Sequence, residues 1–231
     1  IGASMLWVGW FGFKAGSALT AEGLATSAFV VTNTAAAAAV LSWMAMDWLF
    51  KSKPTALGAA SGAVAGLVAI TPASGFVGPI SSIIIGIGAG IFCFTACNVK
   101  MKLGYDDSLD VVGVHGVGGT WGALATGLFA SKAINPAGNN GLLFGNPGQL
   151  WVQFISVVAT WAFAIIGTLV ILSILKAIMG LRVSIEEEIE GVDISAHGEY
   201  AYPGFEMSHR IGGSEMRVLA SEIEKQKGKR E

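Results

Sequence analysis

The chain has 231 residues, of which 53% are hydrophobic and only 13% are charged, and its mean hydropathy is +0.63. So few charged side chains cannot cover a water-soluble domain of this size, and the lack of a basic stripe argues against nucleic acid as a partner. The composition therefore indicates a membrane protein.

The charges are distributed unevenly along the chain. Residues 1–180 contain seven Lys or Arg and five Asp or Glu, whereas residues 181–231 contain seven and eleven. A low density of charge is typical of segments that lie in lipid. We therefore predict two parts, a transmembrane domain over 1–180 and a water-exposed tail over 181–231.

Six apolar segments are long enough, or nearly so, to cross the hydrocarbon core as helices of about 20 residues. The predicted fold class is therefore an all-α polytopic membrane protein with six transmembrane helices. Residue 1 already lies in an apolar run, so the first segment is expected to be truncated, and the third is expected to start at Pro54. The segments cover 1–21, 23–49, 54–71, 79–99, 110–130 and 148–180.

The loop charges predict the orientation of these segments, because Lys and Arg are enriched in cytoplasmic loops. The other side carries only Lys14 with Glu22, and then Lys132. Both ends of the chain are therefore predicted to be cytoplasmic. The cytoplasmic set is Lys51, Lys53, Lys100, Lys102, Lys176 and Arg182.

Small residues inside the apolar segments predict close helix packing. Many of the 32 glycines lie there, where they let helices approach one another. Cys93 and Cys97 are four apart on one apolar run and so share a helix face. We expect buried thiols there rather than a disulfide or a metal pair.

His115 is the single histidine within residues 1–180 and lies in the fifth segment. Gly119 and Gly122 follow it at +4 and +7, which on a helical wheel places His115 on the closely packed side. An ionisable residue at membrane depth is costly, which favours a functional role. The alternative is an interhelical hydrogen bond that only fixes packing.

Trp10, Phe13 and Ser17 lie at i, i+3 and i+7 of the first segment and form one stripe. Two aromatic faces followed by a hydroxyl suit a cation, because the rings attract it and the hydroxyl accepts its hydrogen bonds. The pattern is equally typical of an interfacial aromatic belt, which Trp7 supports. By itself, the stripe favours the belt.

Two further polar residues stand at segment ends. Thr71, beside Pro72, presents its hydroxyl to the membrane interior or caps a helix end. Asp110 opens the fifth segment, where a carboxylate favours the positive end of the helix dipole. We interpret Asp110 as a cap or anchor of the helix start.

The segments contain no pattern typical of catalysis. They have no nucleophile with a neighbouring base, no metal-ligand spacing and no glycine-rich phosphate loop. We therefore expect no enzyme activity and no cofactor.

Four stretches together resemble the Amt/Mep/Rh ammonium transporter family, most closely its Amt branch. They are WVGWFGFKAGSA (7–18), SGAVAGLVAITPASGFVG (61–78), DVVGVHGVGGTWG (110–122) and EGVDISAHGEYAY (190–202). The resemblance implies eleven-helix subunits assembled as homotrimers in the cell membrane, with one pore in each subunit and a cytoplasmic carboxy terminus. The six segments here correspond to the last six helices, the carboxy-terminal half of a subunit.

The resemblance also implies roles for individual residues. Phe13 resembles one of two stacked phenylalanines that close the outer mouth, and Ser17 with Trp10 resembles the site that recruits ammonium from outside. His115 resembles the second of two histidines that line the apolar pore. Thr71 resembles a threonine near the pore, and Asp110 a structural residue beside it.

The 190–202 stretch resembles the tail segment that packs on the cytoplasmic face, where PII-type signalling proteins dock. Its candidate regulatory residues are Asp193, His197, Gly198, Glu199 and Tyr202. One departure lies at the mouth, where the family usually has Asn and this chain has Lys14. A fixed positive charge there opposes the passage of a cation unless it points away or pairs with Glu22.

The implied function is ammonium transport: ammonium is recruited at the aromatic mouth, deprotonated, and conducted through a hydrophobic, histidine-lined pore. The implied partners are ammonium or ammonia, membrane lipid, further copies of the subunit and a PII-type protein. Two alternatives stay open. One is an ammonium sensor, and the other is a non-conducting fragment that needs the amino-terminal half.

Overall fold

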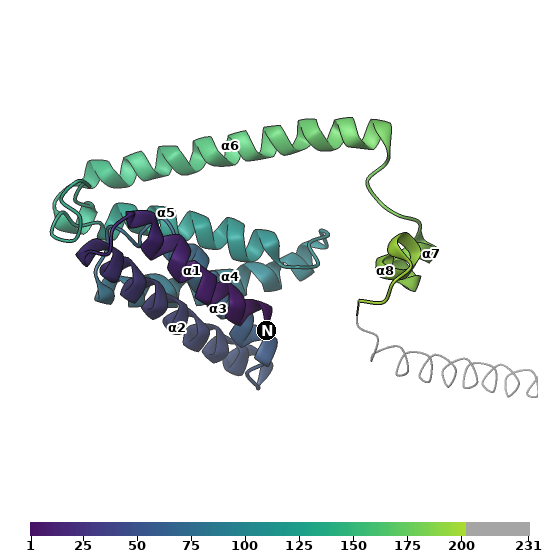
Figure 1. The fold of residues 1–231 in the computed structure, drawn as a ribbon, viewed down its shortest axis with the longest axis horizontal. Helices are drawn as coiled ribbons and strands as arrows, with labels where there is room; N and C mark the ends of the chain where they lie inside the picture. Colours follow the sequence, from purple (N-terminus) through teal and green to yellow (C-terminus); the bar gives the residue numbers. More distant parts are fainter. Residues whose placement is uncertain (202–231) are drawn as a thin grey trace, which may run out of the picture. The chain divides into compact units, whose positions relative to one another are not determined.

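The structure is a computed structural model, and it describes residues 1–201 of the chain (Figure 1). Within that part, every regular element is a helix, which confirms the all-α prediction. The chain divides into two compact units, Ile1–Ile166 and one that begins at Gly167. Each unit is described by itself.

The first unit holds five helices and three short helical turns, and the sixth helix, α6, starts in it and continues into the second unit. Each predicted segment overlaps one of the helices α1 to α6, and α2, α4 and α6 extend beyond the predicted bounds. Their bounds are α1 Gly2–Ala15, η1 Gly16–Ala18, α2 Gly23–Lys51, α3 Ala56–Ile70, α4 Pro79–Leu103, the π-helical turn η2 Val112–Val117, α5 Gly118–Phe129, η3 Leu142–Phe144 and α6 Pro147–Ile178.

Three of these helices are long and apolar enough to cross a membrane: α2, α4 and α6, with 29, 25 and 32 residues. The other three segments form shorter helices, with 14 residues in α1, 15 in α3 and 12 in α5. Helix α1 is short because Leu19, just after η1, has a left-handed φ of 58°, and α5 because η2 precedes it. The predicted count of six spans is therefore supported by length for three helices.

The starts of α3 and α4 test two proline predictions. Pro79 is the first residue of α4, as is favourable for a residue without an N–H. Pro54, however, precedes helix α3, so its predicted place in the first turn is wrong. Helix α3 begins at Ala56 because the hydroxyl of Thr55 caps it, accepting a hydrogen bond of 2.8 Å from the Gly58 N–H.

Helix α2 packs against both α3 and α4 through small residues (Figure 1). A Cβ added at Gly66 of α3 would lie 2.6 Å from the carbonyl oxygen of Ala35 on α2. A Cβ at Gly86 of α4 would approach that same oxygen even more closely. The predicted close packing at glycines is thus confirmed, and it centres on the alanine run 35–39 of α2.

Asp47, near the end of α2, is a fully buried carboxylate that the sequence analysis did not single out. Its Oδ2 accepts hydrogen bonds from the Thr55 hydroxyl at 3.0 Å and from the Thr55 N–H at 3.3 Å. Its Oδ1 lies 3.0 Å from Lys51 Nζ, in an ion pair without directed hydrogen-bond geometry. Asp47 therefore ties the end of α2 to the residue that caps α3.

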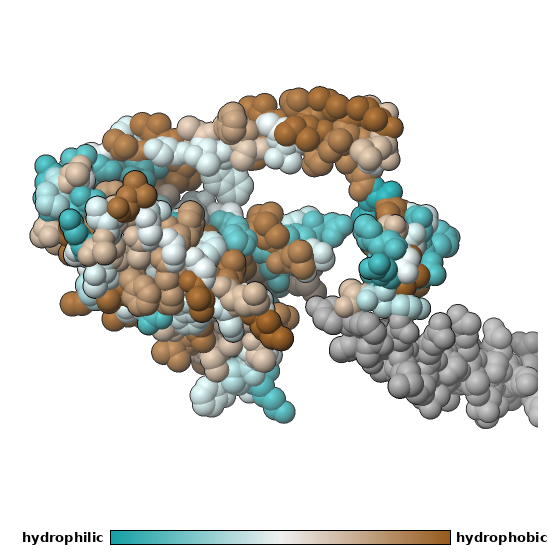
Figure 2. Space-filling model, in the orientation of Figure 1, coloured by the Kyte–Doolittle hydropathy of each residue, from teal (hydrophilic) through white to brown (hydrophobic). Residues whose placement is uncertain are grey.

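Helix α6 has no buried residue, and its surface is hydrophobic over much of its length (Figure 2). In the part of α6 that belongs to the first unit, the Trp161 indole N–H donates a hydrogen bond of 2.8 Å to the Thr120 hydroxyl of α5. A helix that is apolar all round is typical of a membrane or of a helix covered by other helices.

The described part of the second unit, up to residue 201, contains two short helices after α6, namely α7 (Ile185–Glu190) and α8 (Val192–His197). Helix α7 starts with a capping box: the Ser184 hydroxyl accepts from the Glu187 N–H, and the Glu187 carboxylate accepts from the Ser184 N–H. The sequence 184–190 thus specifies its own helix start.

Candidate functional site

Trp10, Phe13, Ser17 and Thr71, which we call the mouth cluster, lie together at the end of α1. The rings of Trp10 and Phe13 meet edge to face, with centroids 5.5 Å apart. The Trp10 indole N–H donates a hydrogen bond of 3.0 Å to the Thr71 hydroxyl. Residues that are 61 positions apart in sequence are thereby joined, so the predicted stripe on α1 acquires a fourth member from the end of α3.

Each hydroxyl in the mouth cluster donates to a backbone carbonyl one helical turn back. Ser17 donates to the Phe13 carbonyl at 2.5 Å, and Thr71 donates to the Leu67 carbonyl at 2.8 Å. The proton of each hydroxyl is therefore engaged, and its oxygen faces other groups as an acceptor. Acceptor oxygens beside ring faces are suited to a cation that carries N–H groups.

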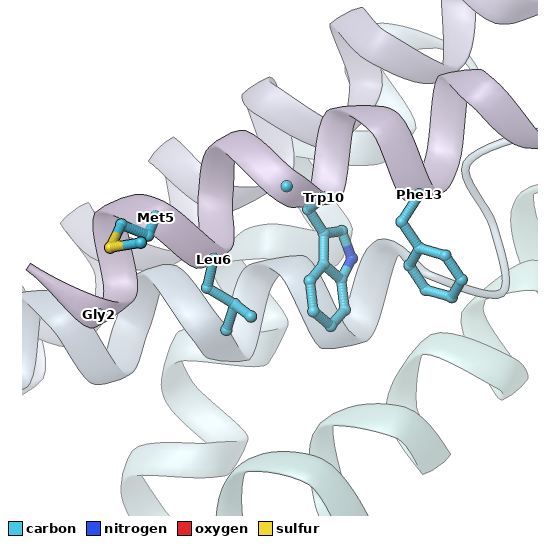
Figure 3. Close-up of a pocket in the computed structure, with 6 residues that line it drawn as sticks. Gly2, Met5, Leu6, Trp10 and Phe13 are labelled. Atoms are coloured by element: carbon cyan, nitrogen blue, oxygen red, sulfur yellow. The ribbon is translucent and has the colours of Figure 1, made fainter.

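An open groove of about 560 Å³ runs along the face of α1 that carries Trp10 and Phe13 (Figure 3). In the close-up, the side chains of Leu6, Trp10 and Phe13 leave the helix on the same side. Met5 and two glycines complete the lining, which is almost wholly apolar. Trp10 and Phe13 of the predicted stripe therefore share one face of α1, whereas Ser17 lies in η1 and does not line the groove.

Lys14 reaches into the mouth cluster. Its Nζ lies 4.0 Å from the centroid of the Phe13 ring and donates a hydrogen bond of 3.3 Å to the Thr71 carbonyl. Within residues 1–201, neither Lys14 nor Glu22 takes part in an ion pair. The positive charge of Lys14 therefore neither points away from the mouth cluster nor pairs with Glu22.

His115 lies in the π-helical turn η2, and its side chain is exposed on the described chain. Gly122, by contrast, is buried against the backbone of Ala69 on α3. The predicted shared face of His115 and Gly122 is therefore wrong. The physical reason is that a π-turn holds more residues than an α-turn, which rotates His115 relative to α5 and is invisible on a wheel of 3.6 residues per turn.

The two cysteines of α4 pack against the turn that carries His115. The Cys93 thiol lies 3.7 Å from the Val114 carbonyl oxygen. A Cβ at Gly113 would lie 2.6 Å from Cys97 Sγ. Both thiols are buried, as predicted, and both are free. The thiols thus fill the space behind η2.

The capping role predicted for Asp110 belongs to Asp107. The Asp107 carboxylate accepts hydrogen bonds of 2.9 Å from the N–H groups of Val111 and Val112, at the start of η2. Asp110 itself has a left-handed φ of 56°, and its carboxylate pairs with Lys100 Nζ. Asp110 therefore anchors the helix start to the end of α4 rather than capping it.

Four of the five tail candidates form one compact turn at the end of α8. The Asp193 carboxylate accepts a hydrogen bond of 3.0 Å from the Ala201 N–H, and this bond lowers the pKa of Asp193. The Asp193 carbonyl accepts from the Glu199 N–H. His197 ends α8, and Gly198 follows in the left-handed conformation, with φ at 68°. Tyr202 lies outside the described residues.

Of the five predicted pore residues, the four of the mouth cluster therefore lie together, and His115 lies apart from them. No hydrogen bond, ion pair or ring contact within residues 1–201 links His115 to the mouth cluster. The contribution of Lys14 could be anticipated from its type and position, whereas the roles of Asp47 and Asp107 depend on tertiary contacts that spacing does not encode.

Comparison with known proteins places this arrangement in a family. The chain matches the model of the Ammonium Transporter Family over residues 1–202. The ammonium transporter of Bacillus subtilis (strain 168) is 52% identical over 203 residues, which are 87% of this chain and 50% of the relative. The chain spans about half the length of such curated relatives.

Solved structures with a similar fold include Mep2 of Saccharomyces cerevisiae, with a TM-score of 0.76 and 37% identity. That match covers 80% of this chain and 43% of Mep2. A protein described as a sensor Amt protein matches with a TM-score of 0.75 and 32% identity, over 84% of this chain and 47% of its own. Each shares a similar helical fold over the part of the chain that it matches.

Proposed function

Because this chain belongs to the ammonium transporter family, we propose that it forms one half of an ammonium-conducting subunit. The observation that carries the proposal is the mouth cluster: the rings of Trp10 and Phe13 meet edge to face, the Trp10 indole donates to the Thr71 hydroxyl, and the Ser17 hydroxyl donates to the Phe13 carbonyl. These groups offer an ammonium ion both ring faces and acceptor oxygens.

The physical difficulty of transport is the removal of water from the ion. A bare charge in an apolar pore loses far more hydration free energy than a neutral amine, which loses only its hydrogen bonds. A path that first holds the cation and then removes a proton from it therefore selects ammonium over potassium, because potassium has no proton to give. The Phe13 ring, exposed on this chain, is proposed to close the outer mouth.

His115 is proposed to line the pore beyond the mouth. A neutral imidazole both donates and accepts a hydrogen bond and exchanges a proton near neutral pH, which suits a molecule that has shed its charge. The π-turn η2 presents this ring on the exposed side of the chain, while Cys93 packs behind the turn. Asp110 is proposed to fix the same turn at its start through Lys100.

The wider assembly is part of the same proposal. The subunit is expected to sit in the cell membrane as a homotrimer, with the six helical segments of this chain as the last six of eleven. The carboxy terminus is expected to be cytoplasmic, where the turn around Asp193, with His197 and Glu199, would meet a PII-type protein. The long apolar surface of α6 supports a membrane location.

Uptake of labelled methylammonium by cells that lack their own ammonium transporters tests the proposal. The complete gene product is expected to take up the label with saturation, and potassium is expected not to compete. His115→Ala is expected to abolish selective uptake while the assembly state in detergent is unchanged. Normal selective uptake by His115→Ala would remove the role assigned to this residue.

A hybrid separates the transporter from the non-conducting fragment. In it, this chain replaces the matching half of the Bacillus subtilis transporter, to which it is 52% identical. Uptake by the hybrid but not by this chain alone would show that the pore needs both halves. An inactive hybrid that is correctly inserted and assembled would favour a non-conducting role.

A sensor is the second candidate, since one structural neighbour is described as a sensor Amt protein. A sensor would bind methylammonium at the mouth cluster without moving it across the membrane. Binding to the purified protein together with no uptake in cells would favour the sensor over the transporter.

A further inference from the structure

Lys14 places a second cation where the proposed substrate would bind. It follows Phe13 directly on α1, and its side chain is half-buried. Its Nζ lies 4.0 Å from the Phe13 ring centroid and 3.3 Å from the Thr71 carbonyl oxygen. The lysine head therefore occupies the space between one ring and one helix end of the mouth cluster.

The lysine head has the chemistry of the ion it would meet. It is a compact ammonium group with one positive charge and three N–H donors. An aromatic face attracts such a group, and so does a carbonyl at the carboxy end of a helix, which is the position of Thr71 after α3. The same two partners would therefore serve a recruited ammonium ion equally well.

The charge of Lys14 has no counterion within the described chain. The ion pairs formed there do not include Lys14, and Glu22, the acidic residue nearest in sequence, is unpaired with it. Within residues 1–201, the repulsion between Lys14 and an arriving cation is consequently not offset by a carboxylate paired with the lysine. The four-carbon stem is flexible, however, so the head can leave its two partners.

We propose that Lys14 is a built-in competitor for the cation at the mouth cluster. A cation reaches the Phe13 ring and the Thr71 carbonyl only when the lysine head moves away from them. This inference rests on the proposed function and deepens it. Competition of this kind raises the substrate concentration needed for half-maximal uptake and leaves the maximal rate unchanged, because the pore beyond the mouth is not altered.

Three single substitutions in the complete gene product test the inference, with uptake of labelled methylammonium measured over a range of concentrations. Lys14→Asn is expected to lower the half-saturating concentration by about three- to tenfold, as removal of one nearby charge predicts. Lys14→Arg keeps the charge and is expected to retain the original value. Lys132→Asn removes an exposed lysine from the loop after α5 and is expected to change nothing.

Equilibrium binding of methylammonium to the purified proteins separates this inference from the proposed function. An unchanged half-saturating concentration and unchanged binding in Lys14→Asn would overturn the competitor role while uptake still supports transport. An equal shift in Lys132→Asn would also overturn it, by assigning the effect to general surface charge. Tighter binding by Lys14→Asn without uptake by any variant would support the competitor role and overturn the transport function. If no variant binds or takes up methylammonium, both proposals are overturned.

Discussion

The indole N–H of Trp10 donates a hydrogen bond to the hydroxyl of Thr71, 3.0 Å away on another helix. This bond connects α1 to the end of α3, so that residues from both helices contribute to the mouth cluster. Because Thr71 also donates to the Leu67 carbonyl, its hydroxyl has a fixed orientation. The Thr71 hydroxyl is therefore held by both bonds, one that it accepts and one that it donates.

Loss of this hydrogen bond is expected to impair the mouth cluster. Trp10→Phe keeps an aromatic face but removes the donor, and Thr71→Val removes the acceptor; each is expected to cost about 1 kcal/mol of stability. Thr71→Ser keeps the hydroxyl and serves as the control. The measurements are thermal unfolding in detergent and methylammonium uptake. If Thr71→Val equals Thr71→Ser in both, the bond has no role in the site.

The packing behind η2 predicts a size limit at Cys93. Its Sγ would lie 3.1 Å from a Cβ at Gly118, so a larger side chain must push the turn that carries His115. Cys93→Leu is expected to cost about 1–3 kcal/mol and to reduce uptake strongly, whereas Cys93→Ala leaves η2 in place. Uptake per assembled molecule distinguishes the two. Full activity of Cys93→Leu would show that η2 tolerates displacement.

The buried Asp47 carboxylate bonds to Thr55 and pairs with Lys51, and we expect substitutions at Asp47 and at Lys51 to lower the stability by different amounts. Asp47→Ala leaves the hydroxyl and N–H of Thr55 without their buried acceptor and is expected to cost about 1–3 kcal/mol. Lys51→Gln removes the counter-charge of a fully buried carboxylate, but the lysine side chain is 48% exposed and a glutamine can still donate a hydrogen bond to Asp47 Oδ1, so the expected cost is lower, about 1 kcal/mol. Chemical denaturation of both variants gives the comparison. Equal losses would mean that the charge of Lys51 matters as much as the cap.

The tail is expected to loosen in acid. The Ser184 N–H lowers the pKa of Glu187, and the Ala201 N–H lowers that of Asp193. A carboxyl whose pKa is lower when folded stabilises the fold above its unfolded pKa, about 4, and this stabilisation is lost as the pH falls through the folded pKa. The turns are therefore intact at neutral pH.

Hydrogen exchange at the Ser184 and Ala201 amides, corrected for intrinsic rates, measures this effect in the intact protein. Faster corrected exchange is expected below about pH 4. Asp193→Asn is expected to weaken protection at Ala201 alone at neutral pH, and Glu187→Gln at Ser184 alone. Protection that is independent of pH in the unaltered protein would contradict the assignment.

Much of the fold could be predicted from the sequence, because the length of an apolar run and a proline at a helix start are local features of the sequence. Helices α2, α4 and α6 follow from their apolar runs, and Pro79 marks the start of α4 by its missing N–H. The start of α3 was not predictable in the same way. Pro54 is the stronger local signal, but Thr55 caps the helix because Asp47, eight residues earlier, fixes its side chain.

The site was predictable only in part. Spacing alone placed Trp10, Phe13 and Ser17 on one face, and the structure adds Thr71 through a contact between helices. The orientation of His115 was not predictable, since hydrophobic period does not reveal where a helix widens into a π-turn. Nor did the sequence reveal that Lys14 folds back onto Phe13, because a lysine stem has many rotamers.

The carbonyl oxygen of Ala35 meets Gly66 from one side and Gly86 from the other. At this seam neither neighbour has room for a methyl group, so any sliding of the three backbones would drive atoms into one another. Helices α2, α3 and α4 are therefore expected to move together rather than to slide past one another. Motion in this part of the chain is therefore expected mainly in side chains outside this seam, such as the Lys14 head on its flexible four-carbon stem.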